Sequence, residues 1–373
     1  MKKWMGILVF AILAWTAFFP GCTRRDLEIE YRETMRVVVK CVWKIVTYPE
    51  VPTGMTLYFF REGDMTPKVI TTSNVDSCVV ELGVGKYKAF AISQSPEEYW
   101  TYQFDNMNNY DLASVTLIEN PSTWYAAYSK VGDDELVVNN PENLAVGIAD
   151  EFEITQEMID EFQEEFYTYK REPFRGIPVT PDEIDKEEID REIRTKYYTI
   201  EIPVDPKNIV SQLWVTIYAG NIDMLRSVRA ATSGMARTFA LTGNTTLHPS
   251  ATQVINQWSL EVKSKADRVG RIDGIITTLG LPDGDIPSVM RDSTLNVSTL
   301  LVDNKTTADF YLNVGDKFRL EEPNPGYRNL YRLVFGSETD PAIIIPEVEP
   351  AHGGGFTAGV EDWEEEVEVE IPI

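Results

Sequence analysis

Residues 35–48 read MRVVVKCVWKIVTY, and this stretch decides the fold class of the chain. Apolar and charged side chains alternate along it, with Val37, Val39, Cys41, Trp43 and Ile45 on one parity and Arg36, Lys40 and Lys44 on the other. Successive side chains of a β-strand point to opposite faces, so this pattern predicts a strand with one buried face.

Similar short runs follow this stretch and are separated by Pro, Gly, Asn and Asp. Their spacing is typical of an antiparallel β-sandwich, because the gaps are too short for the helices that connect parallel strands. In the first half of the chain we expect strands at 55–61, 68–71, 75–82, 87–93, 112–118 and 124–128. In the second half we expect them at 197–204, 209–219, 237–241, 258–262, 271–277, 295–302, 308–314, 318–321, 331–335 and, in an acidic alternating segment, 367–371.

Helical signals occur only between these two sets of strands. Thr155 is placed to cap a helix, with Ile154 and Ile159 as a hydrophobic staple across its first turn. A second helix start at Thr180 opens a highly charged segment. We therefore predict an N-terminal sandwich over 35–172, a charged linker or helix over 173–195, and a C-terminal sandwich over 196–373.

The N-terminus has the features of a secretory signal. Lys2 and Lys3 precede an uncharged run over residues 5–19, which ends at Pro20, Gly21 and Cys22. That run is too short for a spanning helix, which needs about 20 residues. The small residue before Cys22 resembles the lipobox of bacterial lipoproteins. We expect residues 1–21 to be a signal peptide, Cys22 to be lipidated, and residues 22–34 to form a tether.

Composition excludes several classes of function. The chain has 373 residues, 59 acidic and 34 basic, and a net charge of −25, which opposes nucleic-acid binding. It contains no CxxC, HExxH, P-loop or GxSxG motif. Asp283 and Asp285 resemble a calcium loop but lack its other ligands, and we interpret His248 as a turn residue rather than part of a hydrolase triad. We expect no enzyme activity, cofactor or metal.

Cys41 and Cys78 both fall on the apolar parity of their expected strands. The signal implies a compartment in which disulfides can form. Two inward cysteines on neighbouring strands could pair, and buried free thiols are the alternative.

An aromatic run lies at residues 98–104, which read EYWTYQF. Tyr99, Trp100, Tyr102 and Phe104 could form a platform for sugar rings, whereas alternating aromatic residues in a β protein more often pack in the core. Exposure of these rings is therefore required for a glycan-binding platform.

Several features together resemble the fimbrillin-type lipoproteins of Bacteroidota. They are the lipobox-like Cys22, the 36–43 strand, the turn at 52–55, the hairpin at 83–87, the segment ATSGM at 231–235, and an acidic final strand after three glycines at 353–355. The resemblance implies a mainly β fold with two tandem transthyretin-like (Ig-like) antiparallel sandwiches.

The same resemblance implies a non-enzymatic protein of the outer membrane, lipid-anchored at the cell surface or the periplasmic face. Its role would be that of a fimbrial anchor, accessory subunit or adhesin, and its partners would be fimbrial subunits that add a strand to an exposed sheet edge. Arg24 and Arg25 lie beside the lipid, so an anchor fits better than a stalk subunit that is cut to release its first strand. The alternative function is a surface glycan-binding lipoprotein.

Overall fold

The computed structural model describes residues 34–43, 52–120, 135–161, 199–255, 257–282, 291–324 and 326–350. In these ranges the chain is predominantly β-strand, as predicted. Several predictions fall outside them: the signal and Cys22, the strand at 124–128, the linker at 173–195 and the last strand at 367–371.

Two sheets form the sandwich nearest the N-terminus. Sheet A has the order β11-β1-β4, and its strands are β1 (Thr34–Cys41), β4 (Ser77–Gly83) and β11 (Ile200–Val204). Sheet B has the order β12-β9-β5-β2-β3, with β10 also paired to β5. Its strands are β2 (Met55–Arg61), β3 (Lys68–Thr72), β5 (Gly85–Ser93), β9 (Ala145–Ile148), β10 (Phe152–Ile154) and β12 (Lys207–Asn208).

The core of this sandwich follows the alternation seen in the sequence. Val37 and Val39 of β1 are fully buried and pack with Leu57 and Phe59 of β2 across the gap between the sheets. Lys40 lies on the outer face and forms an ion pair with Glu201 of β11. The alternating segment that begins at Met35 therefore forms β1, the central strand of sheet A, which is paired on both sides.

The C-terminal sandwich is also made of two sheets. Sheet C has the order β19-β18-β14-β15-β8, extended by β7 on β14 and β6 on β7. Its strands are β6 (Tyr102–Asp105), β7 (Ser114–Leu117), β8 (Val137–Val138), β14 (Leu225–Ala240), β15 (Thr245–Ile255), β18 (Arg291–Leu301) and β19 (Thr307–Gly315).

Sheet D has the order β16-β17-β13-β21-β20, with β22 also paired to β13. Its strands are β13 (Ser211–Gly220), β16 (Trp258–Ser264), β17 (Val269–Thr278), β20 (Arg319–Glu321), β21 (Leu330–Phe335) and β22 (Ile343–Ile344). Leu213 and Ile217 of β13 face Leu295 and Val297 of β18 in the core between sheets C and D.

A third apolar cluster joins the two sandwiches, and we call it the central core. It takes Tyr58 and Phe90 from sheet B, Leu117 from β7, and Phe239 from β14. Strands also cross between the halves of the sequence. β6, β7 and β8 precede residue 172 but belong to sheet C, whereas β11 and β12 follow residue 196 but belong to sheets A and B. The sheets thus do not divide at 173–195, and the domain bounds from the sequence stay a proposal.

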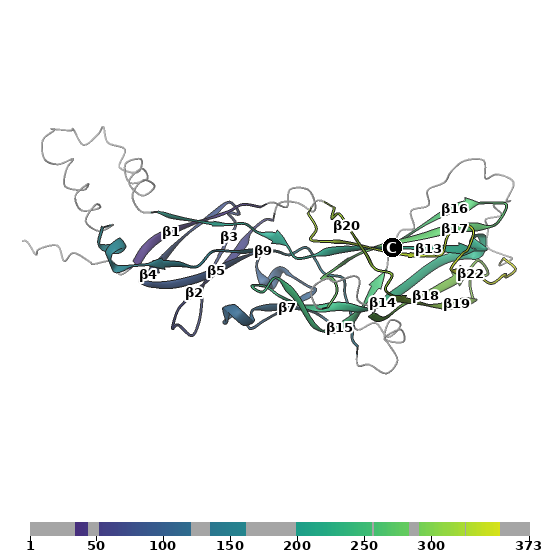
Figure 1. The fold of residues 1–373 in the computed structure, drawn as a ribbon, viewed down its shortest axis with the longest axis horizontal. Coiled ribbons are helices and arrows are strands. Elements are labelled where there is room, and N and C mark those ends of the chain that lie inside the picture. Colours follow the sequence, from purple (N-terminus) through teal and green to yellow (C-terminus); the bar gives the residue numbers. More distant parts are fainter. Residues whose placement is uncertain are drawn as a thin grey trace, which may run out of the picture.

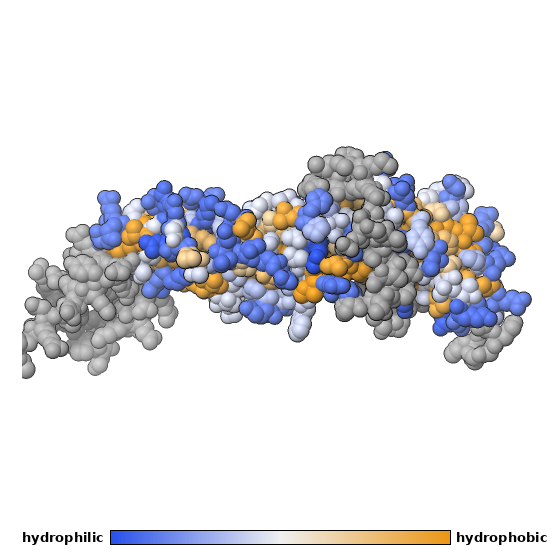
Figure 2. All heavy atoms as spheres, turned by 90° about the horizontal axis from the view of Figure 1, so that it is seen from below, coloured by the Kyte–Doolittle hydropathy of each residue, from blue (hydrophilic) through white to orange (hydrophobic). Residues whose placement is uncertain are grey.

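The molecule is elongated, with the two sandwiches arranged end to end (Figure 1). Thr34 pairs with Gly83 at the end of β4 that is remote from the central core. The described chain therefore begins at one tip of a rod. On the face seen in Figure 2, hydrophilic side chains predominate and hydrophobic ones occur in separate patches along the length.

The expected helix begins where the sequence predicts. Residues 156–161 are helical, and the Thr155 hydroxyl accepts a hydrogen bond from the backbone N–H of Met158. Ile154 and Ile159 are both fully buried, as a hydrophobic staple requires. Within the described ranges, short 3₁₀ turns occur at η1 (Pro96–Glu98), η2 (Tyr110–Leu112) and η4 (Ile222–Met224).

Two long strands differ from the sequence prediction. β14 extends over Leu225–Ala240 rather than 237–241, and β15 was not expected, since its His248 was interpreted as a turn residue. The pairing of β14 with β15 shifts register between Thr232 and Met235 and again between Ala236 and Thr238. Such bulges break the period-two pattern on which the prediction relied.

Candidate functional site

The aromatic run at 98–104 is divided between the interior and the surface. Tyr99 and Tyr102 are buried in the central core with their ring centroids 5.6 Å apart, and Phe104 packs against the same cluster. The Trp100 side chain is 83% exposed. Tyr102 and Phe104 lie on the core-facing side of β6, which is the core packing that alternating aromatic residues in a β protein more often indicate.

Hydrogen bonds fix the buried tyrosines. The Tyr99 hydroxyl donates to the carbonyl of Ser93 at 2.7 Å and lies 2.8 Å from the Ser93 hydroxyl. The Tyr102 hydroxyl donates to the carbonyl of Glu142 at 2.6 Å. Burial raises the pKa of Tyr99 and of Tyr102 above the ordinary value for tyrosine. Burial also raises the pKa of nearby Tyr58 to about 12.

Glu142 holds the aromatic run in place, and no motif in the sequence marks this residue. Its Oε2 atom accepts hydrogen bonds from the backbone N–H groups of Trp100 and Thr101 and from the Thr101 hydroxyl, at 2.8, 2.9 and 2.9 Å. Glu142 lies 41 residues from Thr101, so only the tertiary fold brings them together.

A cavity of about 310 Å³ lies beside this arrangement, where sheet B meets the central core. We call it the junction cavity. Its walls combine two aromatic side chains with amides and one carboxylate, contributed by Trp43, Pro52, Ser93, Gln94, Tyr99, Glu142, Asn143, Leu144, Ala145 and Asn208. Such a mixture of apolar walls and a few polar groups is typical of small-molecule sites.

Asn208 shapes the base of the junction cavity. Its Nδ2 atom donates to Oδ1 of Asn143 at 3.2 Å and to the carbonyl of Gly326 at 2.7 Å, and its Oδ1 accepts from the backbone N–H of Val210. The side chain is buried and links β12, the segment before β9 and the loop before β21. The side-chain carbonyl of Asn143 is thereby oriented, and its amino group forms no hydrogen bond among the described residues.

A second cavity of about 700 Å³ lies at the opposite end of the N-terminal sandwich. Thr34, Tyr87 and Gln156 line it together with side chains of both charges, Arg61, Asp64, Lys68 and Glu81. The Lys68 ammonium group donates to the carbonyl of Glu81, and the Tyr87 hydroxyl donates to the carbonyl of Gly83. These bonds close the sandwich at the tip where the described chain begins.

Cys41 and Cys78 are both buried in the core of the N-terminal sandwich, and both are free thiols in the structure. Val39 is the direct partner of Cys78 in the β1–β4 ladder, which places Cys41 diagonally across from it. Burial raises the pKa of the Cys41 thiol to about 12 and also raises that of Cys78.

The described residues contain no group of three or more His, Cys, Asp or Glu side chains that could hold a metal ion. Asp283, Asp285 and His352 lie outside the described ranges. His248 is exposed on β15 and lines neither of the two cavities above. No helix in the described part of the chain has the length and apolar character to cross a bilayer.

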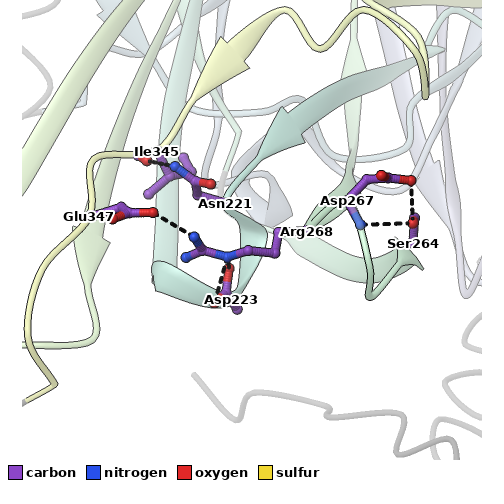
Figure 3. A network of polar contacts seen from close by, with 7 residues as sticks. All are labelled: Asn221, Asp223, Ser264, Asp267, Arg268, Ile345 and Glu347. Carbon is purple, nitrogen blue, oxygen red and sulfur yellow. Dashed lines mark hydrogen bonds and ion pairs between the residues drawn. The ribbon is translucent and has the colours of Figure 1, made fainter.

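A polar network organises the far tip of the C-terminal sandwich (Figure 3). Arg268 donates to Asp223 at 2.9 Å and to Glu347 at 2.6 Å, so it links the β16–β17 turn to η4 and to the segment after β22. Asn221 donates to the carbonyl of Ile345 at 2.9 Å. Both carboxylates raise the pKa of Arg268.

Comparisons with known proteins found several solved structures that are similar to this chain. It is similar to a "putative adhesin" from Bacteroides ovatus, with 14% identity, a TM-score of 0.49, and coverage of 88% of this chain and 98% of that one. It is similar to the fimbrial anchor protein Mfa2 from Porphyromonas gingivalis, with 13% identity, a TM-score of 0.41, and coverage of 81% and 90%.

A third similar structure, from Bacteroides thetaiotaomicron, belongs to the "putative polysaccharide binding proteins (DUF1812)", with 11% identity, a TM-score of 0.44, and coverage of 82% and 93%. No curated protein matches the chain. One family model matches residues 21–256, which is more than half of the sequence. The chain therefore belongs to the family described as a domain of unknown function, DUF5119.

Proposed function

We propose that this chain is a non-enzymatic lipoprotein of the outer membrane that serves as a fimbrial anchor, accessory subunit or adhesin. The main support for this proposal is the position of Thr34 at the start of β1. β1 begins at one tip of the rod, and only residues 23–33 separate it from Cys22. A lipid on Cys22 would hold the molecule by that tip, at most about 40 Å of extended chain from the membrane.

The pairing of β1 supports an anchor rather than a polymerising stalk. β1 is the central strand of sheet A, and Val37 and Val39 are buried between the sheets. Its loss would open the core of the N-terminal sandwich to water. Fimbrial subunits are the proposed partners, bound by strand addition at sheet edges. The strands at these edges include β3 and β16.

Lipid anchoring is tested by replacing Cys22. In the wild type we expect label from a radioactive fatty acid and recovery in the outer-membrane fraction, whereas Cys22→Ala should lose the label and appear in the soluble fraction. Cys41→Ala is the matched control, because its thiol is buried and should not be acylated. Membrane retention of Cys22→Ala would contradict the anchor.

The fimbrial or adhesive role needs a separate measurement. Cells that lack this chain should carry fewer surface fimbriae, or attach less well to host or bacterial surfaces, than wild-type cells. Restoring the wild-type chain should restore the phenotype. Unchanged fimbriation together with unchanged attachment would exclude the proposed role even if the lipid anchor is correct.

Glycan binding is the second candidate function, and the junction cavity favours it. Among the four aromatic residues of the possible platform, only Trp100 is well exposed, so these rings do not support this function. The cavity offers an indole and several amides in place of the platform.

A further inference from the structure

The junction cavity contains polar groups that the protein does not use. Within the described residues, the side-chain amide of Gln94 forms no hydrogen bond, and Glu142 uses Oε2 but not Oε1. Asn143 accepts from Asn208 through Oδ1, which leaves its Nδ2 amino group as a donor. The cavity thus presents two amides and one carboxylate oxygen.

These groups are held by rigid supports. Glu142 is fixed by three hydrogen bonds from residues 100–101, and Asn143 is oriented by the buried Asn208. The Trp43 indole N–H donates to the carbonyl of Val75, which orients the ring at the cavity wall. Pre-organised groups bind a ligand without an additional ordering cost.

The charge and size of the cavity restrict its ligand. The described residues that line it include one carboxylate and no Lys, Arg or His, so an anionic ligand is disfavoured. Amides and a carboxylate suit a molecule with many hydroxyl groups, and an indole provides an apolar face for ring C–H groups. A volume of about 310 Å³ is at the low end for ligand sites and suits a single ring.

We infer that the junction cavity binds one neutral pyranose unit of a glycan. Trp43 forms the wall against which the sugar ring packs, the amides of Gln94 and Asn143 bind its hydroxyl groups, and Oε1 of Glu142 accepts from a further hydroxyl. This inference rests on the proposed adhesive role and names its ligand class. It places the glycan site at the middle of the rod rather than at the free tip.

Binding of neutral methyl glycosides to the purified full chain tests the inference. Saturation-transfer NMR with the methyl glycosides of glucose, galactose, mannose and N-acetylglucosamine should give saturable binding of at least one of them. A glucuronide should bind more weakly, because it adds a second negative charge beside Glu142. The corresponding oligosaccharide then distinguishes a free sugar from one unit of a polymer.

Asn143→Asp keeps the oxygen acceptor for Asn208 and replaces the amino donor with a second carboxylate oxygen, which also adds a negative charge beside Glu142. We expect about a tenfold or greater loss of affinity. Trp43→Leu should reduce affinity similarly by removing the aromatic wall. Trp100→Ala is the matched control, since it removes an exposed indole that does not line the cavity, and it should bind like the wild type. Thermal unfolding midpoints identify any variant that has lost its fold.

The inference is overturned if no neutral glycoside binds, or if Asn143→Asp and Trp43→Leu bind as well as the wild type. Loss of binding in Trp100→Ala alone would instead favour an exposed surface site. Neither result changes the expected outcome of the Cys22→Ala experiment or of the attachment assay. A failure of the glycan-binding inference can therefore be distinguished from a failure of the proposed function.

Discussion

At the scale of single residues, burial sets the chemistry of the ionisable side chains in the core. Three tyrosines around the central core have a raised pKa, with desolvation as the largest cause in each: Tyr58, Tyr99 and Tyr102. Burial disfavours the phenolate, so these side chains stay neutral until the surrounding core opens.

The raised tyrosine pKa values predict alkaline destabilisation. The unfolded chain releases these protons near pH 10, whereas Tyr58 in the folded chain holds its proton to about pH 12. The free energy of unfolding should therefore fall between about pH 10 and 12, by about 1.4 kcal/mol per pH unit for each such group. Urea titrations should show that Tyr58→Phe flattens this fall, while Tyr311→Phe, on an exposed side chain, does not. Equal slopes in all three proteins would contradict the assignment.

The two buried cysteines give a second residue-scale prediction. We expect both thiols to resist alkylation in the folded chain even near pH 9, because burial raises the pKa of Cys41 to about 12. In the unfolded chain, with Cys22 replaced by Ala, both should label without reductant. Labelling that requires reductant would instead establish the disulfide that the sequence leaves open.

At the scale of elements, the long strand β14 depends on a glycine. Gly234 has a φ of +78° at the first register shift with β15. A Cβ atom there would lie 2.6 Å from the Cβ of Ser293. Only glycine meets both requirements, because it tolerates positive φ and leaves room for β18.

Gly234→Ala should therefore lower stability by more than the cost of positive φ alone. Gly63 is the matched control, since its φ is +88° and an added Cβ would contact nothing within 4 Å. We expect Gly63→Ala to cost about 1–2 kcal/mol and Gly234→Ala to cost clearly more. Chemical denaturation measures both, and equal losses would show that the contact with Ser293 is relieved without strain.

At the scale of the whole molecule, the central core makes the two sandwiches one unit. It is built from sheets B and C, and β11 and β12 return to the N-terminal sandwich after the predicted linker. The proposed lipid anchor at one tip would require such a connection, because a flexible joint would not hold the distal sandwich away from the membrane.

Truncating Phe239 in the central core tests this coupling. The side chain is fully buried, so Phe239→Ala should cost about 3–5 kcal/mol. We expect the wild type to unfold in one calorimetric transition. The variant should unfold at lower temperature, either in one transition or in two transitions, one for each sandwich. Tyr311→Ala, on an exposed side chain of sheet C, should change little. Two separate transitions in the wild type would contradict a single unit.

Local sequence patterns were sufficient to predict that the chain is mainly β-strand. The alternation in residues 35–41 reappears as the buried and exposed faces of β1, and the cap at Thr155 starts a helix as expected. These features depend on local periodicity and local hydrogen bonds, which a sequence displays directly. Bulged strands such as β14 and β15 were underestimated because an inserted residue breaks that periodicity.

The positions of the long-range polar contacts become visible in the folded chain alone. Glu142 accepts a hydrogen bond from Thr101, 41 residues away in the sequence. Asn208 donates hydrogen bonds to Asn143 and Gly326, which are 65 and 118 residues away. The sequence leaves open whether the aromatic run at 98–104 forms a surface platform or packs in the core, and in the structure Tyr99, Tyr102 and Phe104 pack in the central core. No local sequence pattern predicts these hydrogen bonds, because the order of the strands in the sheets determines which distant side chains lie around the same cavity.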